Sequence, residues 1–79
     1  MDKNELKENI RVEIERMAEL EEGSLSYSDN FAEKGIDSFV SIQLIAMLED
    51  DHDIVIPDER LGELKSIDDV AKVIEELKK

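Results

Sequence analysis

Ser38 is the nucleophilic side chain with the most informative surroundings in this chain. It follows Gly35, Ile36 and Asp37 and precedes the apolar Phe39. Glycine permits a tight turn before a helix, and aspartate is a favoured N-cap residue. Ser38 would then lie in the first helical turn, where backbone N–H groups lack partners and the helix dipole is positive. This arrangement favours a serine that carries a phosphate or phosphodiester. The alternative is that Asp37 and Ser38 only cap a helix.

His52 is the only histidine of the chain, and histidine is the usual general base for a serine nucleophile. It lies fourteen positions after Ser38, which is about 20 Å along a helix that rises about 1.5 Å per residue. The chain also lacks the Gly-x-Ser-x-Gly elbow of many hydrolases. We therefore expect no catalytic residue and no hydrolase activity.

The acidic run Glu49-Asp50-Asp51-His52-Asp53 is a second candidate for chemistry, as a divalent cation site. Calcium takes about six to eight oxygen ligands, usually from a loop of about twelve residues with a central glycine. This run has no glycine. A specific metal site is therefore not expected, although a concentrated negative surface attracts Mg²⁺ or Ca²⁺ weakly.

The chain is short and strongly acidic. Its 79 residues fit one small domain over residues 1–79, and they include 22 Asp or Glu and 10 Lys or Arg, for a net charge of −12. No lysine or arginine lies between Lys34 and Arg60. Nucleic acids and anionic membrane surfaces require basic patches, so neither is an expected partner. A basic protein surface is the expected partner.

The composition excludes further classes. The chain has no cysteine, which removes disulfides, thiolate zinc sites and cysteine nucleophiles. No apolar run approaches the roughly 20 residues that cross a bilayer, and the first residues are too polar for a signal peptide. We therefore expect a soluble, cytoplasmic protein without a membrane segment.

Hydrophobic periodicity predicts a first helix over about residues 3–20, because apolar side chains recur every three or four positions. These side chains are Leu6, Ile10, Ile14 and Met17. The glycine and serines that follow predict a long loop over residues 21–36. Within this loop, Ser28 or Asp29 is expected to cap a single turn at residues 31–32.

A second helix is expected to follow the cap at Asp37 and to end near Asp53, since eight of the ten residues 39–48 are apolar. A short helix over about residues 59–63 and a last helix capped by Ser66 complete the pattern. The predicted fold class is all-α. We expect a small four-helix bundle of three longer helices and one short helix, with a long loop between the first two.

These features together resemble the acyl carrier proteins, which are small acidic helical carriers of acyl groups. The resemblance covers nearly the whole chain and centres on the motif Gly-x-Asp-Ser-apolar, here Gly35-Ile36-Asp37-Ser38-Phe39. Phe31, seven residues before the serine, and Ile56-Pro57-Asp58 downstream also match. The Asp-Ser pair alone is a weak signal, whereas the motif, the length, the acidity and the helix pattern together are specific.

The resemblance implies that Ser38 carries 4′-phosphopantetheine through a phosphodiester bond, at a site shaped by Gly35 and Asp37. A phosphopantetheinyl transferase would install this arm from coenzyme A, and acyl groups would be carried on its thiol as thioesters. The protein would be a monomeric carrier and not an enzyme. Its further partners would be acyl-transferring and chain-elongating enzymes with basic or apolar docking patches. Four residues match the acyl-chain pocket of the family: Leu48, Ile56, Leu64 and Val70.

The helix after Ser38 departs from the family pattern and favours a specialised member, in polyketide or specialised lipid synthesis, over housekeeping fatty acid synthesis. Phe39 replaces the usual leucine, and Val40 and Gln43 replace acids of the fatty-acid-synthesis type. Because Val40, Gln43 and Met47 share a helix face, we expect Phe39, Val40 and Met47 to form an exposed apolar stripe for partner recognition. The alternative is that this face packs under the aromatic residues of the long loop.

A different class of function follows from the charge alone. An acidic protein-interaction module without a prosthetic group would account for the net charge of −12 but not for the motif around Ser38. The two hypotheses differ in one consequence, because replacing Ser38 disables a carrier and leaves an interaction module intact.

Overall fold

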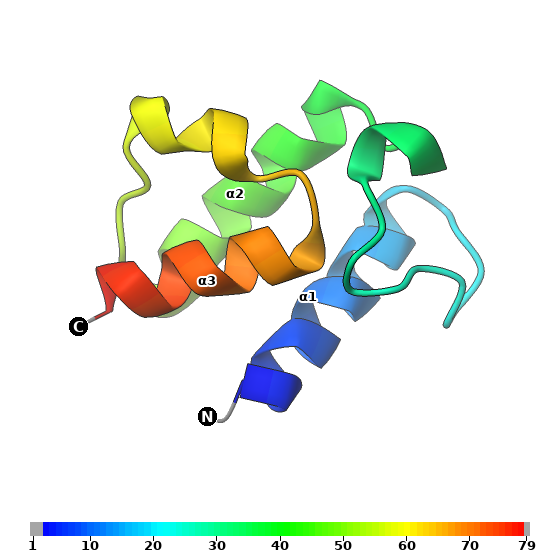
Figure 1. Cartoon of the computed structure of the whole chain (residues 1–79), viewed down its shortest axis with the longest axis horizontal. Coiled ribbons are helices and arrows are strands. Elements are labelled where there is room, and N and C mark those ends of the chain that lie inside the picture. Colours follow the sequence, from blue (N-terminus) through cyan, green and yellow to red (C-terminus); the bar gives the residue numbers. More distant parts are fainter. Residues whose placement is uncertain (1–2, 79) are drawn as a thin grey trace.

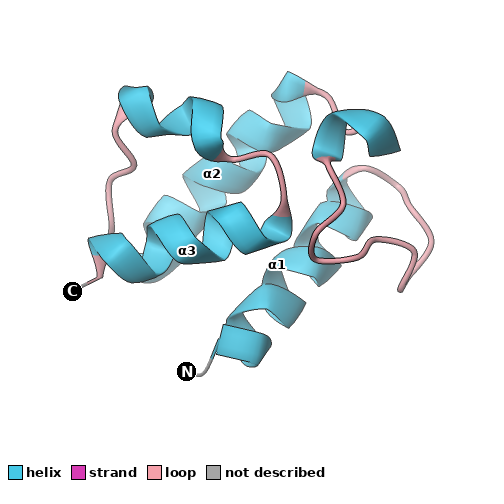
Figure 2. Ribbon diagram, viewed as in Figure 1, coloured by secondary structure: helices cyan, strands magenta, loops and turns pink. Residues whose placement is uncertain are grey.

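The computed structural model describes residues 3–78, and all regular structure in that range is helical. Three α-helices and two 3₁₀-helices follow one another along the chain (Figure 1; Figure 2). They are α1 (Lys3–Met17), η1 (Phe31–Lys34), α2 (Ser38–His52), η2 (Asp58–Glu63) and α3 (Ile67–Leu77). The predicted all-α fold, with three longer helices, a short helix and a long first loop, is confirmed.

The helices enclose one hydrophobic core. α1 contacts both α2 and α3, and α3 also contacts η2. Figure 1 shows the green α2 behind the orange α3, with the yellow η2 above α3. The most deeply buried side chains come from all three α-helices and the first loop: Ile10, Ile14, Leu25, Leu44, Ile67, Val70, Val73 and Ile74. No helix within residues 3–78 combines the length and apolarity required to cross a membrane.

α1 ends at Met17, earlier than the predicted end at about residue 20. A Schellman motif closes the helix: the Leu20 N–H donates to the Glu15 carbonyl at 2.8 Å, and the Glu19 N–H donates to the Arg16 carbonyl at 3.4 Å. Glu19 therefore adopts φ 58°, in the left-handed region that glycine prefers. Periodicity missed this end because the apolar spacing continues to Leu20.

Side-chain caps begin the two later α-helices, as predicted. The Asp37 carboxylate accepts a hydrogen bond from the Val40 N–H at 3.0 Å at the start of α2. The Ser66 hydroxyl accepts one from the Asp69 N–H at 3.3 Å at the start of α3. These local bonds satisfy N–H groups that a helix leaves unpaired in its first turn.

The cap of η1 differs from the prediction. Asn30 takes this role, because its side-chain oxygen accepts a hydrogen bond from the Ala32 N–H at 2.9 Å. The prediction of Ser28 or Asp29 was therefore wrong. The Asp29 carboxylate instead accepts from the Ser26 N–H at 2.8 Å and closes the preceding turn.

Candidate functional site

Ser38 is the first residue of α2, and its side chain is exposed at the end of that helix. Asp37 precedes it as the N-cap. Gly35 adopts φ 76° and closes η1, which turns the chain toward α2. A side chain at position 35 would be strained by this backbone conformation although no atom lies within 4 Å to obstruct it. The structure thus brings Gly35, Asp37 and Ser38 together in one turn.

Two buried side chains anchor the backbone before Ser38. Phe31 and Ile36 are each 5% exposed and belong to the core. The Phe31 N–H donates to the Lys65 carbonyl at 2.9 Å, and the Ile36 N–H donates to the Phe31 carbonyl at 3.0 Å. The turn is therefore hydrogen-bonded to the chain just before α3. Ser38 follows a segment of backbone that is anchored in the core.

The electrostatics at Ser38 suit an anion. The first turn of α2 contains no acidic residue of its own, and the Asp37 carboxylate is engaged by the Val40 N–H. A helix N-terminus presents partial positive charge and N–H donors. Lys34, the nearest cation along the chain, pairs with Asp29 at 3.6 Å. A phosphodiester on the Ser38 hydroxyl would lie against the helix N-terminus, so the residues present fit such a group.

The inward face of α2 contains two residues that were predicted to be exposed. Phe39 is 66% exposed, as predicted. Val40 and Met47, however, are half-buried and pack against the core, so they are less exposed than Phe39 but not fully covered. Val40, Leu44 and Met47 follow one another at spacings of four and three residues, and Leu44 is 2% exposed. These three residues lie on the side of α2 that faces the core. Leu44 is at the centre of that side, and Val40 and Met47 are at its edges.

The outward face of α2 is apolar through other residues. Ile42 is 63% exposed and Ala46 is also exposed, and the polar Gln43 is exposed beside Ile42. A depression of about 190 Å³ lies between this face and η2. Its lining residues are Ile42, Ile45, Ala46, Glu49, Ile56, Asp58 and Leu61.

The four residues that match the acyl-chain pocket of the family are all buried in one core cluster: Leu48, Ile56, Leu64 and Val70. The fold thus joins side chains from α2, the following loop, the end of η2 and α3. Two of them reach surface depressions. Leu48 lines one of about 310 Å³ between α1 and α2, and Ile56 lines the depression between α2 and η2.

The acidic run after Leu48 closes α2. The Glu49 carboxylate accepts from the Ile56 N–H at 2.8 Å and holds the following loop. His52 is the last residue of α2, at the opposite end from Ser38, and its Nδ1 lies 3.4 Å from the Lys78 ammonium. No Ser–His pair is formed. Over residues 3–78, no group of three or more His, Cys, Asp or Glu side chains could hold a metal ion.

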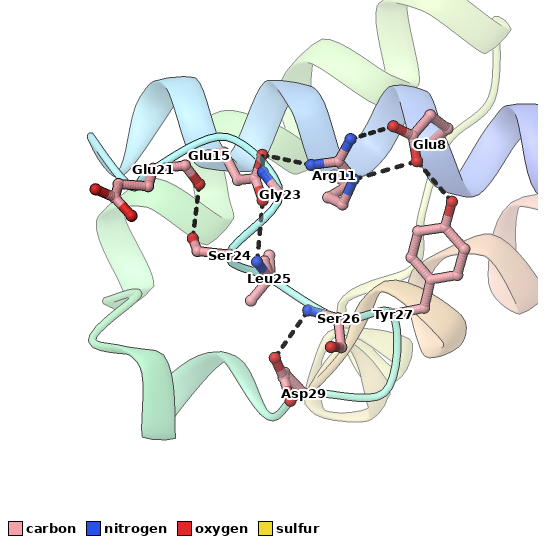
Figure 3. A network of polar contacts seen from close by, with 10 residues as sticks. All are labelled: Glu8, Arg11, Glu15, Glu21, Gly23, Ser24, Leu25, Ser26, Tyr27 and Asp29. Atoms are coloured by element: carbon pink, nitrogen blue, oxygen red, sulfur yellow. Dashed lines mark hydrogen bonds and ion pairs between the residues drawn. The ribbon is translucent and has the colours of Figure 1, made fainter.

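Sequence reasoning missed a buried carboxylate that holds the first loop against α1 (Figure 3). Glu15 is only 3% exposed. Its carboxylate accepts hydrogen bonds from the N–H groups of Gly23 and Leu25, each at 3.0 Å, and from the Arg11 guanidinium at 2.7 Å. Burial acts to raise the pKa of Glu15, but these three donors outweigh it and keep the pKa below its ordinary value.

Arg11 extends this network to Glu8, and Glu8 extends it to Tyr27. The Tyr27 hydroxyl donates to the Glu8 carboxylate at 2.7 Å, as Figure 3 shows. The hydrogen bond from Arg11, assisted by the one from Tyr27, lowers the pKa of Glu8 to about 2. The spacing of Glu8, Arg11 and Glu15 along one helix was a usable sequence signal. Nothing in the sequence, however, indicated that Glu15 would accept hydrogen bonds from the N–H groups of Gly23 and Leu25.

The chain is similar to known proteins over nearly its whole length. A family model described as "Phosphopantetheine attachment site" matches residues 8–74. An acyl carrier protein of Akkermansia muciniphila is 31% identical to the chain over 78 residues, which are 98% of this chain and 98% of that protein. The matched ranges include the turn at Gly35, the exposed Ser38 and the buried cluster beneath them.

Proposed function

The chain belongs to the acyl carrier proteins, a family of carriers and not enzymes that bear a covalent phosphopantetheine on a serine, and we propose that Ser38 is that serine. The observation that carries the proposal is the exposed position of Ser38 at the start of an α-helix. Other serines of the matched range lack this position. Ser41 is half-buried one turn later, and Ser66 is buried as the cap of α3.

The residues around Ser38 support a specific role for each group. The Ser38 hydroxyl gives up its proton, and its oxygen forms the bond to phosphorus while the nucleotide part of coenzyme A leaves. Gly35 and Asp37 hold the turn, and the N–H groups of the first turn of α2 favour the negative phosphodiester. The chain has no cysteine, so the thiol that carries acyl groups has to come from the attached arm.

Delivery of acyl groups to other enzymes completes the proposal. A tethered arm keeps the acyl group concentrated at the active site of the partner. The base-free stretch between Lys34 and Arg60 favours partners with basic patches, and salt should weaken that attraction. The partners would be acyl-transferring and chain-elongating enzymes of fatty acid, polyketide or specialised lipid synthesis. A monomeric state and a cytoplasmic location are parts of the same proposal.

The test is the intact mass of the protein after incubation with coenzyme A, Mg²⁺ and a broad-specificity phosphopantetheinyl transferase. The parent and a Ser41→Ala control should each gain one phosphopantetheine, and Ser38→Ala should gain none. Circular dichroism would establish that all three proteins are folded. Modification of Ser38→Ala would contradict the assignment of the site. A folded parent that gains nothing with several transferases would favour the acidic interaction module instead.

A further inference from the structure

A groove between α1 and α2 lies at the end of α2 that is far from Ser38. Its volume of about 310 Å³ exceeds that of the depression between α2 and η2. This volume is at the lower end of the roughly 300–1,000 Å³ that is typical of sites for small molecules. The groove is lined by residues of the last two turns of α2, including its final residue His52, whereas Ser38 is the first residue of that helix. It is therefore a site separate from Ser38.

The floor of the groove is apolar. Leu6 and Ile10 of α1 and Leu48 of α2 line it, and they are 6%, 1% and 4% exposed. Met47, which is half-buried and packs against the core, also lines it. An aliphatic segment of a ligand would be favoured on this floor, because the contact removes apolar surface of both from water.

Two carboxylates, one from each helix, make the edge of the groove negative. Asp51 of α2 is exposed and forms no ion pair or side-chain hydrogen bond with any of residues 3–78. Glu13 of α1 makes only a 3.7 Å pair with Arg16, whose side chain is 72% exposed. Both carboxylates therefore retain acceptor sites for a cationic donor.

The end of α2 adds to this preference for a cation. The C-terminus of a helix carries partial negative charge, and the groove lies along the last turns of α2. The cation nearest to His52 in the structure is Lys78, whose ammonium donates to His52 Nδ1 at 3.4 Å. Lys78 does not line the groove and pairs with neither Glu13 nor Asp51.

The surroundings of the groove favour a small molecule over a protein partner. A protein interface has an apolar centre, but none of the exposed large hydrophobic side chains among residues 3–78 lines this groove. Those side chains are Phe39, Ile42, Val55 and Leu61. The apolar surface of the groove is therefore confined to its floor, where an aliphatic chain fits.

We propose that the groove between α1 and α2 binds a small aliphatic amine in its ammonium form. The aliphatic stem lies on Ile10 and Leu48, and the ammonium donates to the carboxylates of Glu13 and Asp51. An ammonium group has three donors and no acceptor, which complements two carboxylates. The site does not involve Ser38, so the inference is independent of the proposed function.

The experiment is a titration of the ¹⁵N-labelled protein with hexylammonium chloride near neutral pH, followed by NMR. We expect saturable shifts of the backbone amides that line the groove, with a Kd of about 1–10 mM. Methylammonium, which has the charge without the stem, should bind at least about tenfold more weakly. Hexanol, which has the stem without the charge, should bind about fivefold more weakly. Either compound binding as tightly as hexylammonium would overturn the proposal.

Two double variants test the carboxylates. Glu13→Gln with Asp51→Asn should raise the Kd of hexylammonium about fivefold, because both charged partners are removed. Glu33→Gln with Asp50→Asn is the matched control, since it removes the same two residue types and the same charge at exposed positions outside the groove. The control should stay within about twofold of the parent. An equal loss in both proteins would show that only the net charge attracts the amine, and would overturn the site.

A further probe distinguishes a free amine from the side chain of a protein. Nα-acetyl-lysine methylamide has a shorter stem and a polar backbone, so it should bind about tenfold more weakly than hexylammonium. Equal or tighter binding would assign the groove to a lysine of a partner protein and would overturn the proposal. The titration should give the same Kd for Ser38→Ala, so a failure of phosphopantetheine attachment leaves this result unaffected.

Discussion

Glu19 and Gly35 both have a positive φ angle, which glycine adopts without steric cost and glutamate does not. Gly35, at φ 76°, is the residue type that tolerates this conformation, and it forms the turn before Ser38. Glu19, at φ 58°, adopts it in the Schellman motif that ends α1. A side chain with a Cβ is disfavoured there by roughly 1–2 kcal/mol, so the end of α1 contains local strain.

Glu19→Gly should therefore stabilise the protein by about 0.5–1 kcal/mol, because relief of this strain exceeds the added flexibility of the unfolded chain. The measurement is the free energy of unfolding from urea denaturation. Glu21→Gly is the matched control, since it removes the same side chain at an exposed position whose φ is not positive. If both variants lose stability, the angle at Glu19 is not strained.

The first loop is an element without regular structure over most of its length, yet it is held at several points. Glu15 accepts the N–H groups of Gly23 and Leu25. The Tyr27 carbonyl accepts from the Asp68 N–H at 3.0 Å in the first turn of α3. The loop is thus hydrogen-bonded both to α1 and to the start of α3. The turn before Ser38 follows this anchored part of the loop.

Glu15→Gln should destabilise the fold by about 2 kcal/mol, because an amide has one acceptor oxygen and turns its NH₂ group toward backbone donors. The free energy of unfolding in urea is the measurement. Glu13→Gln is the control, as Glu13 makes only a 3.7 Å pair with the exposed Arg16. Comparable losses in the two variants would show that the bonds to the loop contribute little.

The same network predicts how stability depends on pH. The pKa of Glu15 is lowered in the folded protein, and that of Glu8 is lowered to about 2, from an ordinary value of 4.5. The unfolded chain therefore binds more protons as the pH falls below 4.5. The contribution of these groups is complete above that pH and is lost as the pH falls through the folded-state pKa values. Glu15→Gln should accordingly show a shallower loss of stability between about pH 5 and pH 3.

The molecule as a whole has a net charge of −12, which opposes compaction through self-repulsion. Raising the salt concentration from about 0.1 M to about 1 M shortens the Debye length from about 10 Å to about 3 Å. The midpoint of thermal unfolding should therefore rise with salt, while docking to a basic partner weakens. Because residues 3–78 contain no cluster that could hold a metal ion, Mg²⁺ and Ca²⁺ should raise the midpoint equally. A clear preference for one ion would indicate a site with defined geometry.

Features that depend on a few neighbouring residues were predictable. The caps at Asp37 and Ser66, the start of α2 at Ser38 and the position of η2 were all predicted, because capping and turn formation involve groups within about four residues. The motif at residues 35–39, together with the length, the acidity and the helix pattern, carried the resemblance to acyl carrier proteins, which the comparisons confirm.

Features that depend on which elements meet were not predictable. α2 is apolar on nearly every side, so periodicity could not tell that Val40 and Met47 would pack against the core while Ile42 stayed exposed. The partners of Glu15 lie eight and ten residues away in a loop whose path no local rule specifies. Both outcomes arise because burial is shared among segments distant in sequence, and packing alone determines which face of each helix is covered.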